Sequence, residues 1–293
     1  MSARRTFAEV WREATQRLDA ARLSYGQGTE DAAQEAAWML IHALQWPLLE
    51  TFARLHAVQR RVVPQAALQR VSQLLQARIA SRRPLAYLLG EAWLHGQRFV
   101  VDERVIVPRS FIAELLDDAL APWLRDAPGR IVDACTGSGC LAILAAQRWP
   151  QAQVWAGDIS EDALEVAAAN VALHRSAVQL VRSDLLRQLP DAIDLLLCNP
   201  PYVNAASMRD LPAEFRHEPR LALAGGDDGM DLVRRLLDEA AVHLAAEGVA
   251  VVEIGHERAH FEAAFPRLPV VWMATSEPDR VFLVEAAALR AAR

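Results

Sequence analysis

Residues 130–160 read RIVDACTGSGCLAILAAQRWPQAQVWAGDIS, and their hydrophobic pattern decides the fold class. The apolar runs at 130–134 and 152–157 predict buried strands, and residues 139–148 between them have the spacing of a helix. Two strands joined through a helix of this length are typical of a parallel sheet.

The same alternation continues to the end of the chain. The further predicted elements are a helix at 160–174, strands at 177–182 and 192–198, a helix at 228–245, a strand at 248–254, a helix at 257–265, and strands near 269–274 and 280–285. This pattern predicts a parallel sheet with helices on both faces. No helix separates the last two strands, so we expect them to form an antiparallel hairpin at the sheet edge.

The N-terminal third of the chain has a different pattern of predicted secondary structure. Its predicted helices lie at 6–22, 30–45 and 64–81. The extended pieces that follow lie at 93–95, 98–101 and 105–107. We therefore predict a helical domain over residues 1–85, a β-hairpin linker over 86–109, and a third region over 110–293 that begins with a helix at about 110–121.

All 31 basic residues of the 293 are arginine, and this composition excludes several mechanisms. Without lysine there is no Walker-type phosphate site, no Schiff base and no lysine general base. The charge is also uneven: residues 1–100 carry 13 Arg against 8 acidic residues, and the rest carries 18 against 29. A basic N-terminal part and an acidic C-terminal part are consistent with a domain that faces nucleic acid, joined to a domain that binds a cation or a basic protein. They are equally consistent with a solvated helical surface.

The sequence also favours a cytoplasmic protein. No run of about 18 apolar residues is present to cross a membrane, and the charged N-terminal helix does not resemble a signal peptide. Three cysteines are too few and too irregularly spaced for a disulfide framework or a zinc site, and the histidines show no metal-ligand spacing. We expect no metal and no membrane partner.

A glycine loop follows the first strand of the predicted sheet. It runs from Asp133 to Cys140, and Gly137 and Gly139 allow a tight turn and a close approach to a ligand. Ala142 occupies the place of the third glycine in the dinucleotide fingerprint, which argues against a pyrophosphate ligand.

Two further carboxylates end the next strands. Asp158 lies 19 residues past Gly139, where a carboxylate can accept from two ribose hydroxyls. Asp184, beside Leu185, follows the third strand and could flank an adenine amine. Each could instead be a turn former or a helix cap. Three carboxylates in register at successive strand ends nevertheless indicate a ligand site.

The fourth strand ends in Asn199-Pro-Pro-Tyr202. Proline has no backbone N–H and forces the preceding residue toward extended geometry, so no strand or helix continues through Pro200 and Pro201. An ordinary proline turn is the simpler interpretation of this loop, but it does not account for the other motifs.

Together these motifs resemble those of S-adenosylmethionine-dependent methyltransferases of the seven-stranded Rossmann-like type. In that class an Asn-Pro-Pro-Tyr loop marks enzymes that methylate a nitrogen conjugated to a planar system, meaning an adenine amine or a glutamine amide. The resemblance implies an α/β fold, namely a class I methyltransferase domain with a small N-terminal helical domain and a β-hairpin linker, and S-adenosyl-L-methionine as cofactor. The implied cofactor-binding residues are Asp133, Thr136, Gly137, Gly139, Asp158, Ile159, Asp184, Leu185 and Asn199, and the implied catalytic residues are Asn199, Pro200, Pro201 and Tyr202.

Amide chemistry gives this loop a physical rationale. An amide nitrogen is a poor nucleophile because its lone pair is delocalised into the carbonyl group. The Asn199 side-chain oxygen and the Pro200 carbonyl can accept both N–H groups of a target amide and so concentrate electron density on nitrogen. The Tyr202 ring can pack on the planar amide.

Nearly the whole chain is similar to protein-glutamine methyltransferases, through RRPLAYLLGEAWLHGQRFVVDERVIVPRS and HEPRLALAGGDDGMDLVRRLL. Release-factor enzymes usually continue the linker as Pro-Arg-Pro-Glu-Thr, whereas this chain reads Pro108-Arg-Ser-Phe-Ile112. LSYGQGTEDAAQEAAWML is similar to the enzymes that methylate a glutamine in the third protein of the large ribosomal subunit, although Phe111 stands where proline is expected. This resemblance implies that ribosomal protein as substrate, with contact to ribosomal RNA or an assembling particle.

Three other functions remain open at this level. The same chemistry could act on a glutamine of a release factor. Methyl transfer could also act on an adenine amine of nucleic acid, although the acidic C-terminal part of the chain argues against a duplex-binding cleft. The chain could also be a cofactor sensor or ribosome-assembly factor that only binds.

The remaining charged residues near these motifs have no assigned role. His217 and Glu218 could line the substrate entrance, but we expect them to be solvated loop charges. Arg109 is expected either to contact the substrate or a residue that does, or to be a surface arginine. Glu253 ends the strand 248–254 without a predicted function.

Overall fold

The computed structural model describes residues 4–293 and divides the chain into two compact units. The helical unit comprises the chain through Ala92 together with Pro212–His217, and the sheet unit comprises Trp93–Leu211 and Glu218–Arg293. The predicted helical domain ended earlier, at residue 85, and the sequence did not predict the return of Pro212–His217 to the helical unit.

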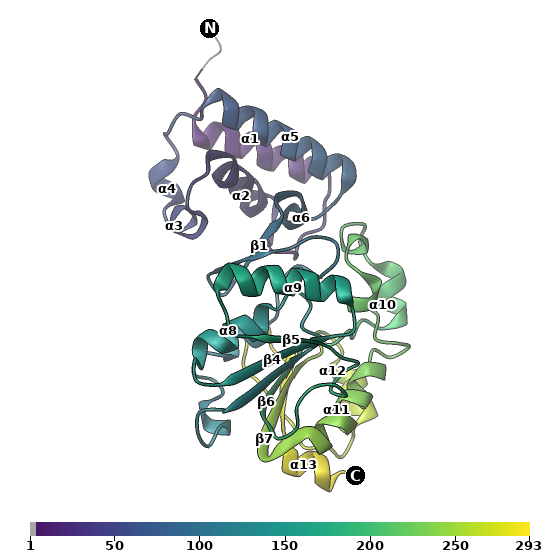
Figure 1. The fold of residues 1–293 in the computed structure, drawn as a ribbon. Coiled ribbons are helices and arrows are strands. Elements are labelled where there is room, and N and C mark those ends of the chain that lie inside the picture. Colours follow the sequence, from purple (N-terminus) through teal and green to yellow (C-terminus); the bar gives the residue numbers. More distant parts are fainter. Residues whose placement is uncertain (1–3) are drawn as a thin grey trace. The chain divides into compact units, whose positions relative to one another are not determined.

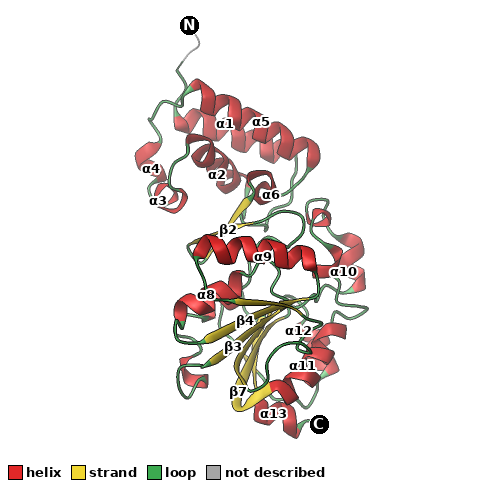
Figure 2. Cartoon of the chain, viewed as in Figure 1, coloured by secondary structure: helices red, strands yellow, loops and turns green. Residues whose placement is uncertain are grey.

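The helical unit is built from three longer helices and three short ones. These are α1 (Phe7–Ala20), α2 (Ala32–Leu44), α3 (Leu48–Phe52), α4 (Leu55–Val58), α5 (Gln65–Ser81) and α6 (Leu85–Leu89) (Figures 1 and 2). Thr6 and Glu9 form a capping box that satisfies free N–H groups at the start of α1, and the Asp31 side chain accepts from the Gln34 N–H at the start of α2. These caps explain why helices begin where the apolar spacing begins.

The sheet unit holds a seven-stranded sheet in the order β5-β4-β3-β6-β7-β9-β8. Its strands are β3 (Arg130–Ala134), β4 (Gln153–Asp158), β5 (Gln179–Arg182), β6 (Ile193–Cys198), β7 (Leu244–Glu253), β8 (Val271–Trp272) and β9 (Val281–Glu285). Strands β3 to β7 pair in parallel, and β9 pairs antiparallel with both β7 and β8. The α/β fold with a seven-stranded Rossmann-like sheet is therefore confirmed, including the antiparallel hairpin at its edge.

Alternate residues of each central strand enter two separate cores. Val249 and Val251 of β7 pack into one core, and Ala250 and Val252 pack into the other. The first core is covered by α7 (Ile112–Leu115) and α8 (Cys140–Arg148), and the second by α11 (Asp231–His243), α12 (Arg258–Ala264) and α13 (Ala286–Ala291). Burial on both faces explains the continuous apolar runs of the sequence.

The strand order reverses between β3 and β6. The helix α8 leads from β3 to β4 on one side, and α9 (Glu161–His174) leads on to β5, whereas β6 lies on the other side of β3 (Figure 1). Such a switch point opens a crevice at the carboxyl ends of the strands. The glycine loop, Asp158, Asp184 and Asn199 all follow these strand ends.

Two predicted elements near the linker are wrong. Strands β1 (Glu91–Leu94) and β2 (Gln97–Val100) form the predicted hairpin, but residues 105–107 are not a strand. The Val107 N–H donates instead to the buried Glu218 side chain, 3.0 Å away. The predicted helix at 110–121 is helical only over Ile112–Leu115, followed by a 3₁₀ turn at Ala121–Trp123. The Asp117 carbonyl between them accepts from the Arg148 side chain.

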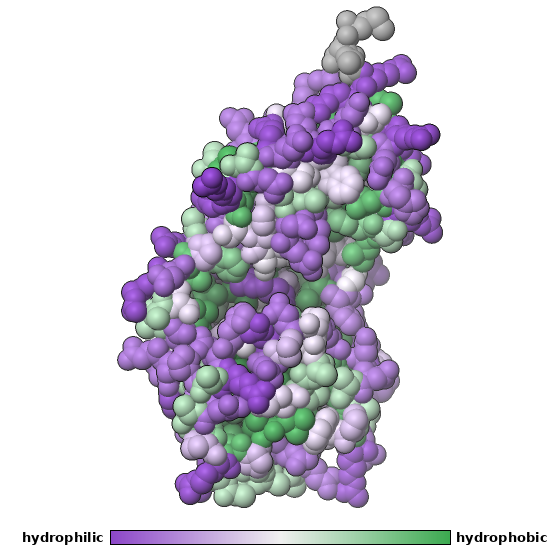
Figure 3. All heavy atoms as spheres, turned by 180° about the vertical axis from the view of Figure 1, so that it is seen from behind, coloured by the Kyte–Doolittle hydropathy of each residue, from purple (hydrophilic) through white to green (hydrophobic). Residues whose placement is uncertain are grey.

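The surface of the described residues is mainly hydrophilic on the face drawn in Figure 3, with smaller apolar patches. Within residues 4–293 no helix is long and apolar enough to cross a membrane. The other short elements are α10 (Ala205–Asp210) and 3₁₀ turns at Phe215–His217 and Arg220–Ala222.

Asn170 of α9 connects the end of β2 to the glycine loop. Its side chain accepts from the Val100 N–H at 2.7 Å and donates to the carbonyls of Val100 and Ser138.

Asn170→Ala should lower the free energy of unfolding by about 2–4 kcal/mol, because it leaves buried backbone groups without partners. Urea unfolding measures this, with the exposed Gln151→Ala as control; equal stability of the two variants would contradict the assignment.

Candidate cofactor and substrate site

A cavity of about 380 Å³ lies at the carboxyl ends of β3, β4, β5 and β6. Its lining combines apolar side chains, such as Ile159 and Leu185, with the polar groups of Asp158, Asp184 and Asn199. Concave sites of this kind, mostly apolar with a few convergent polar groups, are typical of small-molecule binding. It is therefore the candidate site.

The glycine loop bends sharply beneath this cavity. Gly139 begins α8 with φ +78°, and a Cβ there would lie 3.2 Å from the Cβ of Ala167. Both the left-handed conformation and the close helix favour glycine at this position. The loop thereby brings the N-terminus of α8 up to the site.

Asp133 is buried under the loop. One carboxylate oxygen, Oδ2, accepts from the Thr136 hydroxyl at 2.5 Å and the Ala142 N–H at 3.1 Å. The other oxygen, Oδ1, has no hydrogen-bond partner among residues 4–293. Burial raises the pKa of the Asp133 carboxyl to about 7, against the lowering effect of those two donors. An unpaired buried carboxylate oxygen of this kind favours a cationic or hydrogen-donating ligand.

Asp158 ends β4 and is fixed by the glycine loop. Its carboxylate accepts from the N–H groups of Gly137 and Ser160, both at 2.9 Å. Burial raises the pKa of the Asp158 carboxyl, and the two backbone donors oppose that rise. A carboxylate accepts at about four positions, so acceptor sites remain for a ligand's hydroxyl groups.

Asp184 is paired within the protein. Both of its carboxylate oxygens lie 2.8 Å from Nη2 of Arg235 on α11, and Arg187 lies 3.3 Å away. Leu185 beside it has φ +54° and is buried, so its side chain forms part of the apolar lining. Arg235 also lines the cavity and was missed by sequence analysis, because an arginine in an amphipathic helix gives no local signal.

The Asn199-Pro-Pro-Tyr202 loop leaves β6 at the edge of the cavity. Asn199 and Pro201 line the cavity, and within residues 4–293 the Asn199 side chain and the Pro200 carbonyl have no hydrogen-bond partner in the protein. Hydrogen bonds from Val203 N–H to the Leu223 carbonyl and from Gly225 N–H to the Val203 carbonyl hold the loop's far end. The Asn199 side chain thus reaches the cavity from a loop that is held at its far end, and the Pro200 carbonyl is a second unpaired acceptor beside it in the chain.

Tyr202 is not part of the cavity lining. A Cβ on Gly255 would lie 2.5 Å from the Tyr202 ring, so the ring packs directly on this glycine after β7. Burial raises the pKa of the Tyr202 hydroxyl, and the nearby Glu253 raises it further. In this structure Tyr202 supports the loop through its packing on Gly255.

Two buried carboxylates hold the linker. Glu218 accepts from Arg109 through both oxygens, at 2.5 and 2.8 Å, and Glu253 accepts from the Ser110 hydroxyl at 2.6 Å and the Phe111 N–H at 2.9 Å. The prediction that Glu218 is solvated is wrong, since its side chain is fully buried. An isolated loop sequence contains no signal for a partner 109 residues away.

The predicted site residues thus fall into two groups. Those that line the cavity are Gly137, Asp158, Ile159, Asp184, Leu185, Asn199 and Pro201. Those absent from the lining are Asp133, Thr136, Gly139, Pro200 and Tyr202. Sequence analysis missed the part of the lining that comes from the linker and from the segment before α11, namely Arg104, Val105, Ile106, Pro219, Leu221, Ala222, Ala224, Gly225 and Gly226. No cluster of potential metal ligands occurs in the described part of the chain.

Comparison with known proteins connects this geometry to a family. Residues 111–263 match the family described as Methyltransferase small domain, and residues 9–90 match the PrmC N-terminal domain. A ribosomal protein uL3 glutamine methyltransferase of Bordetella pertussis is 54% identical over 95% of this chain and 94% of its own length. One from Burkholderia pseudomallei is 47% identical over 98% and 96%.

The fold also resembles a solved structure of low sequence identity. The human Mettl16 catalytic domain, in complex with the MAT2A 3'UTR hairpin 1, superposes with a TM-score of 0.50 at 14% identity. The match covers 83% of this chain and 88% of that one. At this identity the likeness concerns the fold alone.

The buried Glu253 gives a pH-dependent stability that can be tested. Burial raises the pKa of its carboxyl to about 7, from 4.5 in the unfolded chain. Between these values the unfolded chain releases the proton first, so the free energy of unfolding should fall as pH rises from about 4.5 to 7. Glu253→Gln cannot ionise and should reduce this decline by up to about 3 kcal/mol.

Chemical denaturation at intervals between pH 4.5 and 8 measures the decline. The control is Asp210→Asn, an exposed carboxyl of the same unit. A decline of equal size in wild type and Glu253→Gln would show that Glu253 is charged at pH 5.

Proposed function

The chain belongs to the family of ribosomal protein uL3 glutamine methyltransferases, and we propose that its Asn199–Tyr202 loop binds the glutamine amide that receives the methyl group. The enzyme transfers a methyl group from S-adenosyl-L-methionine to the side-chain amide nitrogen of a glutamine in ribosomal protein uL3. The observation that carries the assignment of the loop is the Asn199 side chain, which lines the cavity and has no hydrogen-bond partner among residues 4–293; the Pro200 carbonyl, the next acceptor along the chain, is also unpaired there.

The residues of the cavity fit the cofactor. Ile159 and Leu185 offer apolar surfaces for a planar base, and Asp158 has acceptor positions left for ribose hydroxyls. The unpaired Oδ1 of Asp133, buried under the glycine loop, suits a cationic group. S-adenosylmethionine supplies an electrophilic methyl group carried on a sulfonium.

The loop residues would prepare the nucleophile. Asn199 and Pro200 would accept the two N–H groups of the target amide, which concentrates electron density on its nitrogen and fixes its direction. Pro201 has no N–H that could compete for these acceptors. Tyr202 would hold the loop in place through its packing on Gly255, rather than by stacking on the substrate. Alignment and electrostatics then account for most of the catalysis, without a strong base.

The partners of the helical unit form a second part of the proposal. Its exposed arginines among the described residues are Arg4, Arg12, Arg17, Arg22, Arg54, Arg60, Arg61, Arg70 and Arg216. Since uL3 itself binds RNA in the ribosome, this basic surface would contact ribosomal RNA on an assembling particle, and such contact weakens steeply with salt. The three free cysteines and a ribosomal substrate support a cytoplasmic location.

A methylation assay distinguishes the candidate substrates. With labelled S-adenosylmethionine, we expect label on a glutamine of uL3 and none on a release factor, RNA or DNA. Mass mapping of the product identifies the residue. Label on the release factor alone would support glutamine methylation but contradict uL3 as the substrate. Label on nucleic acid would contradict the amide mechanism.

Asn199→Ala tests the acceptor role of the loop. The substitution removes one of two acceptors, so kcat should fall about a hundredfold or more. Cofactor affinity, measured by calorimetry, should change little because Asp158 and the apolar walls remain. Asn199→Asp keeps an oxygen acceptor and should retain more activity than Ala; equal activity of wild type and Asn199→Ala would rule out the mechanism.

A further inference from the structure

Helix α11 contacts the turn that follows β5 at two places. Nη2 of Arg235 lies 2.8 Å from each carboxylate oxygen of Asp184. The Glu239 carboxylate accepts from the Leu186 N–H at 2.9 Å. Arg235 and Glu239 are four residues apart in the chain, so they lie on the same face of the helix. One helix face therefore holds both ends of the turn Asp184–Leu186.

The turn has an unfavourable backbone conformation that such contacts can support. Leu185 has φ +54°, a left-handed conformation that side chains other than glycine rarely adopt. The Ser183 hydroxyl donates to the Leu185 carbonyl at 2.7 Å, and the Asp184 N–H donates to the Gln188 side chain at 3.0 Å. These two bonds fix the backbone of the turn, whereas Arg235 fixes the Asp184 carboxylate itself.

The Asp184 carboxylate keeps an acceptor position for a ligand. A carboxylate accepts at about four positions. Arg235 occupies one on each oxygen, and Nη1 of Arg187 lies 3.3 Å from Oδ2. Within residues 4–293 no further donor is bonded to Oδ1. Since the Asp184 side chain is 31% exposed and lines the cavity, a ligand can reach the remaining position.

That position selects a hydrogen-bond donor. An ionised carboxylate only accepts, so it binds an N–H group and repels a carbonyl oxygen. In the proposed function the adenine base lies against Leu185, the residue after Asp184, and the exocyclic amine of adenine is such a donor. Hypoxanthine has a carbonyl oxygen in place of this amine. A site built to bind a donor rejects an analogue that lacks it.

We propose that Arg235 is a positioning residue for recognition of the adenine base of the cofactor. It fixes the Asp184 carboxylate before the cofactor binds, so that the remaining acceptor position meets the exocyclic amine without first being ordered. This inference rests on the proposed function, in which the cavity holds S-adenosylmethionine, and adds to it the residue through which the base is selected.

Two ligands that differ only at the base test the proposal. S-adenosylhomocysteine carries the amine, and S-inosylhomocysteine carries a carbonyl oxygen at the same place. By calorimetry the wild type should bind the adenosyl compound at least about tenfold more tightly. Arg235→Gln should weaken binding of the adenosyl compound about fivefold to tenfold and change that of the inosyl compound less than about twofold. The ratio of the two dissociation constants should therefore fall.

Two further substitutions on α11 sharpen this measurement. Arg235→Lys keeps a charged donor and should restore part of the ratio. Arg234→Gln is the matched control, because Arg234 is 42% exposed against 41% for Arg235 and pairs with Asp228 and Asp231 instead of Asp184. Its ratio should equal that of the wild type.

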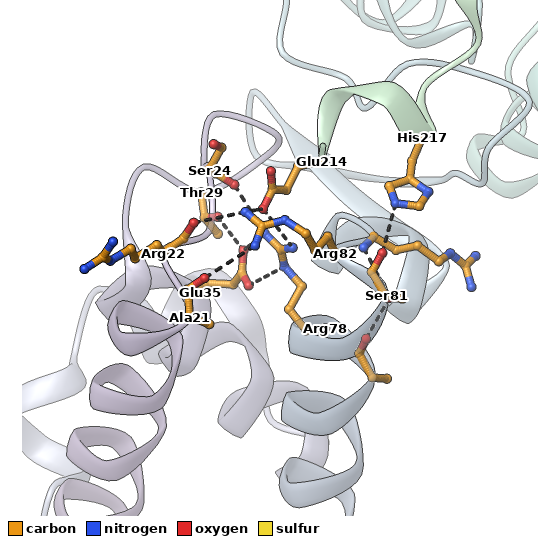
Figure 4. Close-up of polar contacts among 12 residues, drawn as sticks. Ala21, Arg22, Ser24, Thr29, Glu35, Arg78, Ser81, Arg82, Glu214 and His217 are labelled. Carbon is orange, nitrogen blue, oxygen red and sulfur yellow. Dashed lines mark hydrogen bonds and ion pairs between the residues drawn. The ribbon is translucent and has the colours of Figure 1, made fainter. Parts of the chain in front are cut away.

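A second control removes an arginine ion pair elsewhere in the chain. Arg82 lies 2.7 Å from the buried Glu214 within the helical unit (Figure 4), and neither residue lines the cavity. Arg82→Gln should lower the midpoint of urea unfolding, because the buried carboxylate loses its nearest partner, but it should leave the ratio unchanged. This variant separates a loss of stability from a loss of base recognition.

Three results would overturn the proposal. They are an unchanged ratio in Arg235→Gln, an equal loss of affinity for both compounds in that variant, and equal binding of both compounds by the wild type. Asp184→Ala removes the acceptor and should lower the ratio at least as much as Arg235→Gln does. Adding Arg235→Gln to it should have little further effect, because both substitutions act at one acceptor. If the wild type binds neither compound, the proposed function fails instead.

Discussion

The meeting of four parallel strand ends at one edge of the sheet is the constraint on which the rest of the structure depends. Because β3 lies between β4 and β6, the residues that follow β3, β4, β5 and β6 converge there although they are far apart in the chain. The glycine loop, Asp158, Asp184 and Asn199 occupy these four positions. Each contributes one property of the cavity, and none could do so if the strand order did not reverse at this point.

Buried carboxylates connect this edge to the segments around it. Asp133 holds the glycine loop through Thr136 and Ala142, Glu253 holds Ser110 and Phe111 of the linker, and Glu218 holds Arg109. The partners of Asp133 lie within nine residues of it, whereas those of Glu253 and Glu218 lie more than 100 residues away. Carboxylates suit this task because one group can satisfy several backbone and side-chain donors, which irregular segments otherwise leave unpaired.

Sequence patterns predicted the regular parts well. Buried strands gave continuous apolar runs, so the strands of the sheet and the antiparallel hairpin at its edge could be predicted. The strand-end positions of Asp158, Asp184 and Asn199 followed from the same pattern. Local patterns could not reveal Arg235, whose role depends on α11 packing beside Asp184, or the burial of Glu218, whose partner Arg109 precedes it by 109 residues. The direction of the Tyr202 ring depends on Gly255 and was equally hidden.

The short pairing of Val203 with Ala224 has an evolutionary consequence. Because it brings the two ends of residues 204–223 together, this stretch is closed at its base, and its exposed positions, apart from the buried Glu214 and Glu218, can change at little cost to the sheet. Asp158, Asp184 and Asn199 lie outside the stretch, whereas Pro219, Leu221 and Ala222 of the cavity lining lie within it. Substitutions at those exposed positions can therefore reshape one side of the cavity while the groups that follow the sheet strands keep their places.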